Sequence, residues 1–175
     1  PKADGTVLEI GFGSGHNLPN YNKKNIDKII GLEPSVHMQK FSKKKLKGFD
    51  VNFELITERA EEIPLESNSI DSVVCTYTLC SISNPEMALS EIRRVLKKDG
   101  KFIFTEHAAS PDLKINKFQK KIEPLWKVIA DGCHLTRDIK TMLAENGFSI
   151  NNSEDMYLPG TPKFIGYHIW GLLKK

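Results

Sequence analysis

Residues 6–21, TVLEIGFGSGHNLPNY, carry the strongest structural signal in the chain. Its opening apolar run is typical of a buried strand, and Gly11, Gly13 and Gly15 then follow at every second position. Because three side chains are missing, a ligand can approach the backbone where the strand ends, and a following helix would offer it free N–H groups. Glu9 adds a carboxyl group just before this turn.

The composition indicates one globular domain spanning residues 1–175, large enough to bury a substantial core. Hydrophobic residues make up 39% and charged residues 27% of the chain, which are ordinary proportions. The net charge of +3 is too small to indicate nucleic-acid binding, and aromatic and basic residues do not alternate as they do in single-strand binders. We expect the basic run at 43–47 to be a solvent-exposed face.

The chain contains three cysteines, Cys75, Cys80 and Cys133, none of them in a CxxC pair. Their odd number and spacing argue against a disulfide framework and against a metal site, and favour a reducing, cytoplasmic compartment. No apolar run reaches the roughly 18 residues of a membrane span, which leaves peripheral membrane contact open. The sequence starts at Pro1 and reaches a strand within six residues, so a preceding helix or anchor also stays open.

Strand and helix signals alternate along the chain. Strands are predicted at residues 6–10, 27–33, 51–57, 70–79, 101–107, 148–158 and 163–174. Helices are predicted at 35–46 (with Ser35 as N-cap), 85–100 (closed by Gly100), 111–130 (interrupted near Pro124) and 136–147 (with Thr136 leading). This order predicts an α/β fold, a doubly wound Rossmann-like sheet with helices on both faces. The PGTP turn at 159–162 is too short to join parallel strands, so the last strand is expected to run antiparallel at or near the edge.

The glycine spacing distinguishes two kinds of cofactor. A dinucleotide fingerprint would need glycine at position 16, where the chain has His16. The E-x-G-x-G-x-G spacing suits a positively charged aminoacyl-sulfonium cofactor, whose ammonium group Glu9 can orient. Glu33, in the stretch GLEPS and 22 residues after Gly11, can accept hydrogen bonds from both hydroxyls of a ribose.

With these residues the chain resembles, over nearly its whole length, the class I S-adenosylmethionine-dependent methyltransferases. VLEIGFGSG and GLEPS resemble their first two motifs, ERAEEIPLESNSIDSVVC their adenine segment, and EIRRVLKKDGKFIFTEH their helix and fifth strand. The resemblance implies seven strands and S-adenosyl-L-methionine as cofactor, with S-adenosyl-L-homocysteine as product. It implies cofactor contacts at Glu9, Gly11, Gly13, Gly15, Glu33, Pro34, Ala60, Glu61, Cys75, Thr76 and Leu79. Arg59 stands where many members carry Asp.

A narrower similarity links the chain to small-thiol methyltransferases, the microsomal methyltransferase-like proteins and their microbial relatives. It rests on CTYTLCSI (75–82), EH (106–107), PLWKVIADGCHLTR (124–137) and the closing HIWG. The similarity implies methyl transfer to a small thiol. Eukaryotic members carry an N-terminal hydrophobic segment that is absent from this sequence.

The acceptor site is expected beyond the carboxyl ends of the fourth and fifth strands, covered by residues 108–137. There, His107 is a candidate general base or acceptor-orienting group, or a structural histidine. Arg137 is a candidate partner for an anionic acceptor, or pairs with an acid in its own helix. Asp131 either assists deprotonation or holds the Gly132 turn, and Cys133 is expected to be a buried structural thiol.

Three functions remain open from the sequence. The first is methyl transfer to a small thiol. The second is methyl transfer to a phospholipid headgroup amine or a quinone-type precursor. The third is a non-catalytic module that binds S-adenosylmethionine. The first two imply a small-molecule acceptor, and the oligomeric state is left open.

Overall fold

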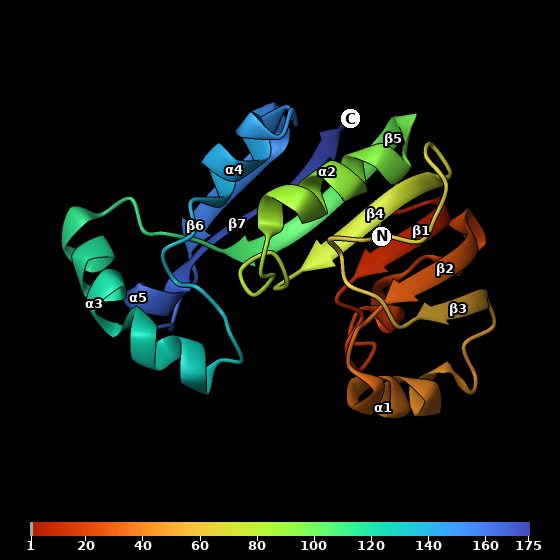
Figure 1. Ribbon diagram of the computed structural model, residues 1–175, viewed down its shortest axis with the longest axis horizontal. Helices are drawn as coiled ribbons and strands as arrows, with labels where there is room; N and C mark the ends of the chain where they lie inside the picture. The colour runs from red at the N-terminus through yellow and green to blue at the C-terminus, as the bar shows by residue number, and fades with distance from the viewer. Residues whose placement is uncertain (1) are drawn as a thin grey trace.

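The computed structural model describes residues 2–175, which form a seven-stranded sheet in the order β3-β2-β1-β4-β5-β7-β6 (Figure 1). The strands are β1 (Gly5–Ile10), β2 (Ile26–Leu32), β3 (Asn52–Ile56), β4 (Ile70–Thr76), β5 (Leu96–His107), β6 (Ser153–Tyr157) and β7 (Tyr167–Lys174). The helices are α1 (Val36–Leu46), α2 (Pro85–Val95), α3 (Leu113–Ile129), α4 (Ile139–Glu145) and α5 (Lys163–Gly166). The doubly wound sheet that the sequence predicts is confirmed.

Strand direction also agrees with the prediction. The pairs of β1 with β2, β1 with β4, β2 with β3 and β4 with β5 are parallel. β7 runs antiparallel to both of its neighbours, β5 and β6, and lies one strand from the edge. In this arrangement the carboxyl ends of β1, β2, β4 and β5 meet at one end of the sheet, and α3 and α5 lie beyond it (Figure 1).

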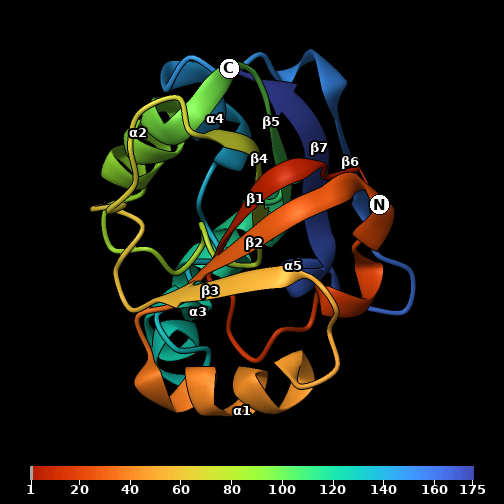
Figure 2. The ribbon, with the colours of Figure 1, turned by 90° about the vertical axis from the view of Figure 1, so that its right-hand side faces the viewer.

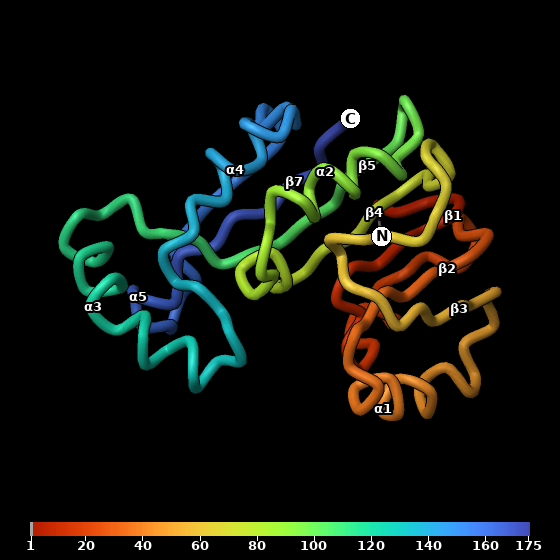
Figure 3. Tube along the Cα trace, viewed as in Figure 1, coloured from red at the N-terminus to blue at the C-terminus, as the bar shows by residue number. Residues whose placement is uncertain are grey.

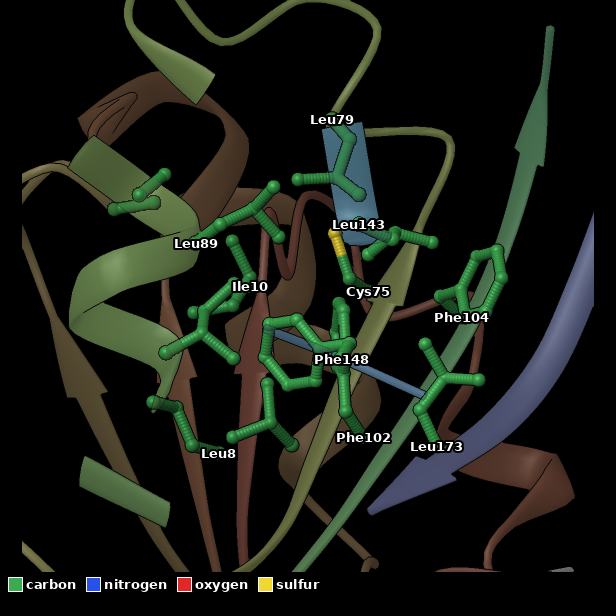
Figure 4. Packing of buried hydrophobic residues seen from close by; sticks show 14 of the residues in the cluster. Leu8, Ile10, Cys75, Leu79, Leu89, Phe102, Phe104, Leu143, Phe148 and Leu173 are labelled. Carbon is green, nitrogen blue, oxygen red and sulfur yellow. The ribbon is translucent and has the colours of Figure 1, made fainter. Parts of the chain in front are cut away.

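The main core lies between the sheet and the layer of α2 and α4, which Figure 2 shows on one side of the strands. Leu89 and Ile92 of α2 and Leu143 of α4 have no exposed surface. They pack with Phe102 and Phe104 of β5 (Figure 4). Each of these side chains contributes about 2 kcal/mol by leaving water. Because Leu89 and Ile92 recur at helical spacing in the sequence, α2 turns this side toward the sheet.

The opposite face of the sheet is covered less completely. Leu46 at the end of α1 packs there on a cluster that includes Val7 and Ile29. The glycine turn is followed by two short 3-10 turns, η1 (Leu18–Asn20) and η2 (Lys23–Asn25), so the helix expected after β1 does not form. Pro19 and the asparagines around it favour turns over helix, which accounts for the difference.

Two predicted helix boundaries are wrong. The helix expected to reach Gly100 ends at Val95, because Leu96 is buried and pairs with Ile70 as the first residue of β5. The helix expected from Thr136 starts at Ile139, because the side chain of Asp138 accepts a hydrogen bond from the Thr141 N–H and caps it. The end of α2 differs because a pairing partner elsewhere in the fold outweighs the local pattern. The start of α4 differs because Asp138, and not Thr136, supplies the N-cap.

Two further boundaries differ near the end of the chain. α3 continues through Pro124, where an interruption was expected. The strand predicted from 148 starts at Ser153, after the 3-10 turn η3 (Ile150–Asn152), and β7 starts at Tyr167, after α5. Within residues 2–175, no helix is both long and apolar enough to cross a membrane.

Candidate cofactor and acceptor site

The glycine turn after β1 requires glycine for two separate reasons. Gly11, Gly13 and Gly15 adopt φ angles of 66°, 54° and 73°, in the left-handed region that favours glycine. A Cβ atom on Gly11 would also lie 2.3 Å from Oγ1 of Thr78, in the loop after β4. The turn therefore brings the backbone of β1 and the loop after β4 into close contact.

Glu33, at the end of β2, links its own loop to the glycine turn. Its Oε2 accepts a hydrogen bond of 2.8 Å from the Gly13 N–H, and its Oε1 accepts one of 2.8 Å from the Ser35 N–H. A carboxylate offers about four lone-pair positions, so roughly two remain free. Glu33 is thus held in place while it keeps acceptors for two further donors, such as the hydroxyls of a ribose.

A cavity of about 540 Å³ opens beside these residues, a volume suited to a nucleoside-sized ligand. Five of the residues predicted to contact the cofactor line it, namely Gly11, Glu33, Pro34, Ala60 and Glu61. Glu61 accepts a hydrogen bond of 3.1 Å from the Asn84 N–H, which ties the cavity wall to the start of α2. Tyr77, Ser81 and Ile82, from the loop after β4, close the cavity on the other side.

Glu9 lies behind the glycine turn in a buried polar pocket. The Tyr21 hydroxyl donates to its Oε2 at 2.5 Å, and Asn17 Nδ2 donates to its Oε1 at 3.0 Å. The same Asn17 Nδ2 lies 3.1 Å from Oγ1 of Thr76, another predicted cofactor residue. Burial raises the pKa of Glu9 to about 7, although these two hydrogen bonds oppose the shift. A neighbouring cation would favour the ionised form.

Six of the predicted cofactor residues do not line the cavity, namely Glu9, Gly13, Gly15, Thr76, Cys75 and Leu79. Two of these, Cys75 and Leu79, are hydrophobic core residues with no exposed surface (Figure 4). Below the loop after β4, the buried Glu106 carboxylate accepts the N–H groups of Thr78, Leu79 and Cys80 at 2.7, 2.9 and 3.3 Å. Glu106 therefore fixes the backbone of this loop, a role that the sequence reasoning missed.

His107, at the end of β5, lies in a cluster with two cysteines. Its Nε2 is 2.6 Å from Sγ of Cys133, and Trp126 Nε1 donates to the same sulfur at 3.4 Å. The three possible ligand atoms of Cys80, His107 and Cys133 lie within 4.8 Å of one another. The hydrogen bond from Cys80, followed by those from His107 and Trp126, lowers the pKa of Cys133, whereas the pKa of Cys80 is raised.

Arg137 lies against the loop after β4. Its guanidinium donates to the carbonyl of Leu79, and at 2.7 Å to that of Ile82. The acid in its own helix that the sequence suggested as a partner is not paired with it among residues 2–175. Arg137 therefore holds the same loop that Glu106 holds, through carbonyl groups in place of N–H groups.

Asp131 lies at the edge of the cofactor cavity and forms no hydrogen bond with His107 within the described residues. It is exposed, has a φ of 48°, and lines the cavity with Ala130. The chain then turns back, and the His134 N–H donates to the Cys80 carbonyl at 2.9 Å. The segment after α3, traced in Figure 3, thus joins the loop after β4 at the end of the sheet.

The sequence reasoning also missed Tyr77, which lines the cavity with a φ of 52°. Its ring lies edge-on to His168 at 5.5 Å between centroids. A left-handed conformation in a residue other than glycine carries no signal in a single sequence. Tyr21 and Asn17 were equally hidden, because only the fold brings them to Glu9.

Comparison with known proteins assigns this architecture. The family described as "Methyltransferase domain" matches residues 8–104, more than half of the chain. Thiol S-methyltransferase TMT1B of Rattus norvegicus is 35% identical over 170 residues, covering 95% of this chain and 69% of the rat protein. The chain belongs to the class I S-adenosylmethionine-dependent methyltransferases. It is an enzyme of this class, and its cofactor is S-adenosyl-L-methionine.

Other relatives agree with the methyltransferase assignment. Thiol S-methyltransferase TMT1A of Homo sapiens is 32% identical over 179 residues, covering 100% of this chain and 72% of the human protein. A solved S-adenosylmethionine-dependent methyltransferase from Methanosarcina mazei superimposes with a TM-score of 0.77, at 16% identity. That superposition covers 100% of this methyltransferase and 94% of the archaeal chain, and it supports the fold alone.

Proposed function

We propose that this methyltransferase transfers the methyl group of S-adenosylmethionine to the sulfur of a small thiol. The observation that carries the proposal is the extent of the similarity to the rat thiol S-methyltransferase, which spans 95% of the chain. The match to the general methyltransferase family ends at residue 104. The similarity therefore continues through nearly all of residues 108–137, the segment next to the proposed acceptor site.

In this proposal the cofactor lies across the carboxyl ends of β1, β2 and β4. Glu33 binds the ribose hydroxyls with its free lone pairs, and the cavity wall at Ala60 and Glu61 holds the adenine. Glu9 acts on the ammonium group of the methionine portion, directly or through Asn17 and Tyr21. Gly11, Gly13 and Gly15 let the backbone come close to the cofactor. Cys75 and Leu79 pack in the core beneath the site.

The reaction is an in-line displacement on the methyl carbon. An acceptor thiol loses its proton, and the sulfur lone pair forms a bond to the methyl carbon. The bond between that carbon and the cofactor's sulfonium sulfur breaks, and its electron pair stays on the sulfur of S-adenosylhomocysteine. A free thiol with a pKa near 8.5 is only a few per cent ionised at neutral pH. The enzyme must therefore align the acceptor and stabilise its thiolate.

The residues near the end of β5 bind and orient the acceptor. His107 lies at this end of the sheet and orients the acceptor sulfur or takes its proton. Arg137 is a positioning residue, because its guanidinium acts on the loop carbonyls of Leu79 and Ile82. Asp131 lines the cofactor cavity and forms no hydrogen bond with His107 within the described residues, so we assign it to the edge of the cofactor site.

Formation of S-adenosylhomocysteine with a panel of acceptors tests the proposal. The panel contains alkyl thiols, hydrogen sulfide, phosphatidylethanolamine and a quinone precursor. We expect turnover with thiols and none with the other two classes. Turnover confined to the lipid or the quinone precursor would discard the thiol assignment while keeping cofactor and fold. Tight cofactor binding without any turnover would favour a binding module.

A further inference from the structure

We propose that Cys80, His107 and Cys133 bind a zinc ion, and that its fourth coordination position takes the sulfur of the acceptor thiol. The three-residue metal site stands on the geometry alone, whereas the identity of the fourth ligand rests on the proposed function. The spacing of the cysteines in the sequence argued against such a site. The fold brings them together from separate segments.

Backbone hydrogen bonds hold the three residues in position. The Cys80 N–H donates to Glu106 at 3.3 Å, and the Cys80 carbonyl accepts from the His134 N–H at 2.9 Å. The Cys133 N–H donates to the Ala130 carbonyl at 3.1 Å. His107 is paired across the sheet with His168 of β7. The ligand atoms are thus carried by a strand end and two fixed turns, as a rigid metal site requires.

The set of donors matches zinc. Two thiols and one imidazole suit this borderline-soft ion, which binds both kinds of ligand in tetrahedral sites. Three protein ligands with one open position are typical of catalytic zinc sites, whereas structural sites are closed by four. Zinc with two cysteine thiolates is electrically neutral. The flanking charges of Glu106 and Arg137, which hold the same loop, also balance each other.

The present distances show what zinc binding requires. His107 Nε2 and Cys133 Sγ are 2.6 Å apart. Tetrahedral bonds of the usual Zn–N and Zn–S lengths would place these two atoms about 3.5 Å apart. Side-chain rotation must therefore separate them by about 1 Å. His107 Nδ1 is buried without a hydrogen-bond partner among residues 2–175, so no hydrogen bond of this atom opposes a small rotation of the ring.

None of the three residues lines the cofactor cavity, but residues next to them in the chain or across the sheet do. Ser81, next to Cys80 in the chain, lines that cavity, and so does Asp131, two residues before Cys133. Tyr77 lines it as well and contacts His168, the cross-strand neighbour of His107. An acceptor bound at the open position would therefore lie beside the cofactor, as methyl transfer requires.

The chemistry balances with this arrangement. As a zinc ligand, His107 orients the acceptor sulfur through the metal and does not take its proton. The acceptor thiol binds to zinc and releases its proton to solvent, which gives a complex of Zn²⁺ with three thiolates and one imidazole and a net charge of −1. The thiolate lone pair attacks the methyl carbon, and the sulfonium bond breaks toward S-adenosylhomocysteine. The product is a neutral thioether, a weaker ligand than a thiolate, so it leaves and reopens the fourth position.

Metal analysis of the purified chain tests the site without reference to activity. The protein is prepared without a metal-binding tag, equilibrated with zinc, freed of loose metal and measured by mass spectrometry. We expect about one zinc per chain, as for other three-ligand sites. Cys80→Ser and Cys133→Ser should each weaken binding at least about tenfold. The control is His37→Asn, on the exposed side of α1, which should keep the metal.

Cobalt replacement and X-ray absorption of the unaltered protein make the test independent of whether the variants fold. We expect thiolate-to-cobalt charge-transfer bands, and an absorption spectrum that fits two sulfur ligands and one nitrogen ligand. A chain that retains less than about a tenth of an equivalent of zinc overturns the site. Zinc retained by both cysteine variants overturns it equally.

A thiol titration separates this inference from the proposed function. Adding an alkyl thiol to the cobalt protein should shift its spectrum, and an unchanged spectrum overturns the assignment of the fourth ligand. Thiol methylation at an unchanged rate after zinc removal would overturn the inference and leave the thiol S-methyltransferase function standing. A zinc-loaded chain whose spectrum responds to thiols, yet which methylates only another acceptor, would support the metal site and refute the function.

Discussion

Replacing Glu9 with Gln should stabilise the cofactor-free protein while weakening the binding of the cofactor. Burial raises the pKa of Glu9 from 4.5 to about 7, so the folded state holds a proton on this group that the unfolded state has already released. The free energy of unfolding therefore falls as pH rises through this window. A shift of about 2.5 units corresponds to about 3 kcal/mol, lost in full above about pH 7.

Gln has the shape of the protonated acid and carries no charge. We expect Glu9→Gln to exceed the parent protein by about 3 kcal/mol in unfolding free energy at about pH 8, and to match it at about pH 4. Urea unfolding followed by circular dichroism, without cofactor, measures both. Calorimetric titration with S-adenosylmethionine should show affinity lower by about tenfold or more, because a charge-assisted contact to the ammonium group is lost.

Glu145→Gln is the matched control, since Glu145 is exposed on α4 and makes no side-chain hydrogen bond within the described residues. It should leave both measurements unchanged. Equal stability of the parent and Glu9→Gln proteins at about pH 8, or pH profiles of the same slope, would refute the reasoning. Such a result would mean that Glu9 ionises in the cofactor-free protein without loss of stability. Contacts stronger than the hydrogen bonds from Tyr21 and Asn17 would then have to stabilise its charge.

Three other changes test the site and the core. Gly11→Ala should weaken cofactor binding about tenfold or more, because its Cβ would lie 2.3 Å from Thr78 Oγ1 and the φ angle is positive. Calorimetric titration measures the affinity, and an unchanged value would contradict this prediction. Leu89→Ala should cost about 2–5 kcal/mol in urea unfolding, since the side chain is fully buried between α2 and the sheet; a loss below about 1 kcal/mol would mean that the core closes over the gap. Arg137→Lys should lower kcat while cofactor affinity changes little, because Lys cannot donate to the carbonyls of Leu79 and Ile82 together in the same geometry. An unchanged kcat in a steady-state assay would show that Arg137 does not position the loop.

The contact between Glu33 and the glycine turn could be predicted because its signals are local. Three glycines, a strand-end acid and a second acid 22 residues after Gly11 lie at the carboxyl ends of two successive strands, and parallel pairing brings these ends together. The antiparallel β7 followed from the short PGTP turn in the same way. In each instance one short stretch carries both the pattern and its geometric consequence.

The acceptor side could not be predicted to the same degree. Cys80, His107 and Cys133 lie in three segments whose approach depends on how α3 and its following turn dock on the sheet. Nothing in the spacing of the cysteines records that docking. The end of α2 differs from its prediction for a related reason, because Leu96 pairs with Ile70 only in the assembled fold. The start of α4 differs for a local reason, since Asp138, and not Thr136, supplies the N-cap.

Both the N–H groups and the carbonyl groups of the loop after β4 are hydrogen-bonded to charged side chains. Glu106 accepts hydrogen bonds from N–H groups of the loop, and Arg137 donates hydrogen bonds to its carbonyl groups. The backbone conformation of the loop therefore depends little on the side chains that it carries. Ser81 and Ile82, which face the cofactor cavity, can therefore vary without remodelling the turn. An evolving or engineered enzyme could change what these two positions recognise while the catalytic framework beneath them stays as it is.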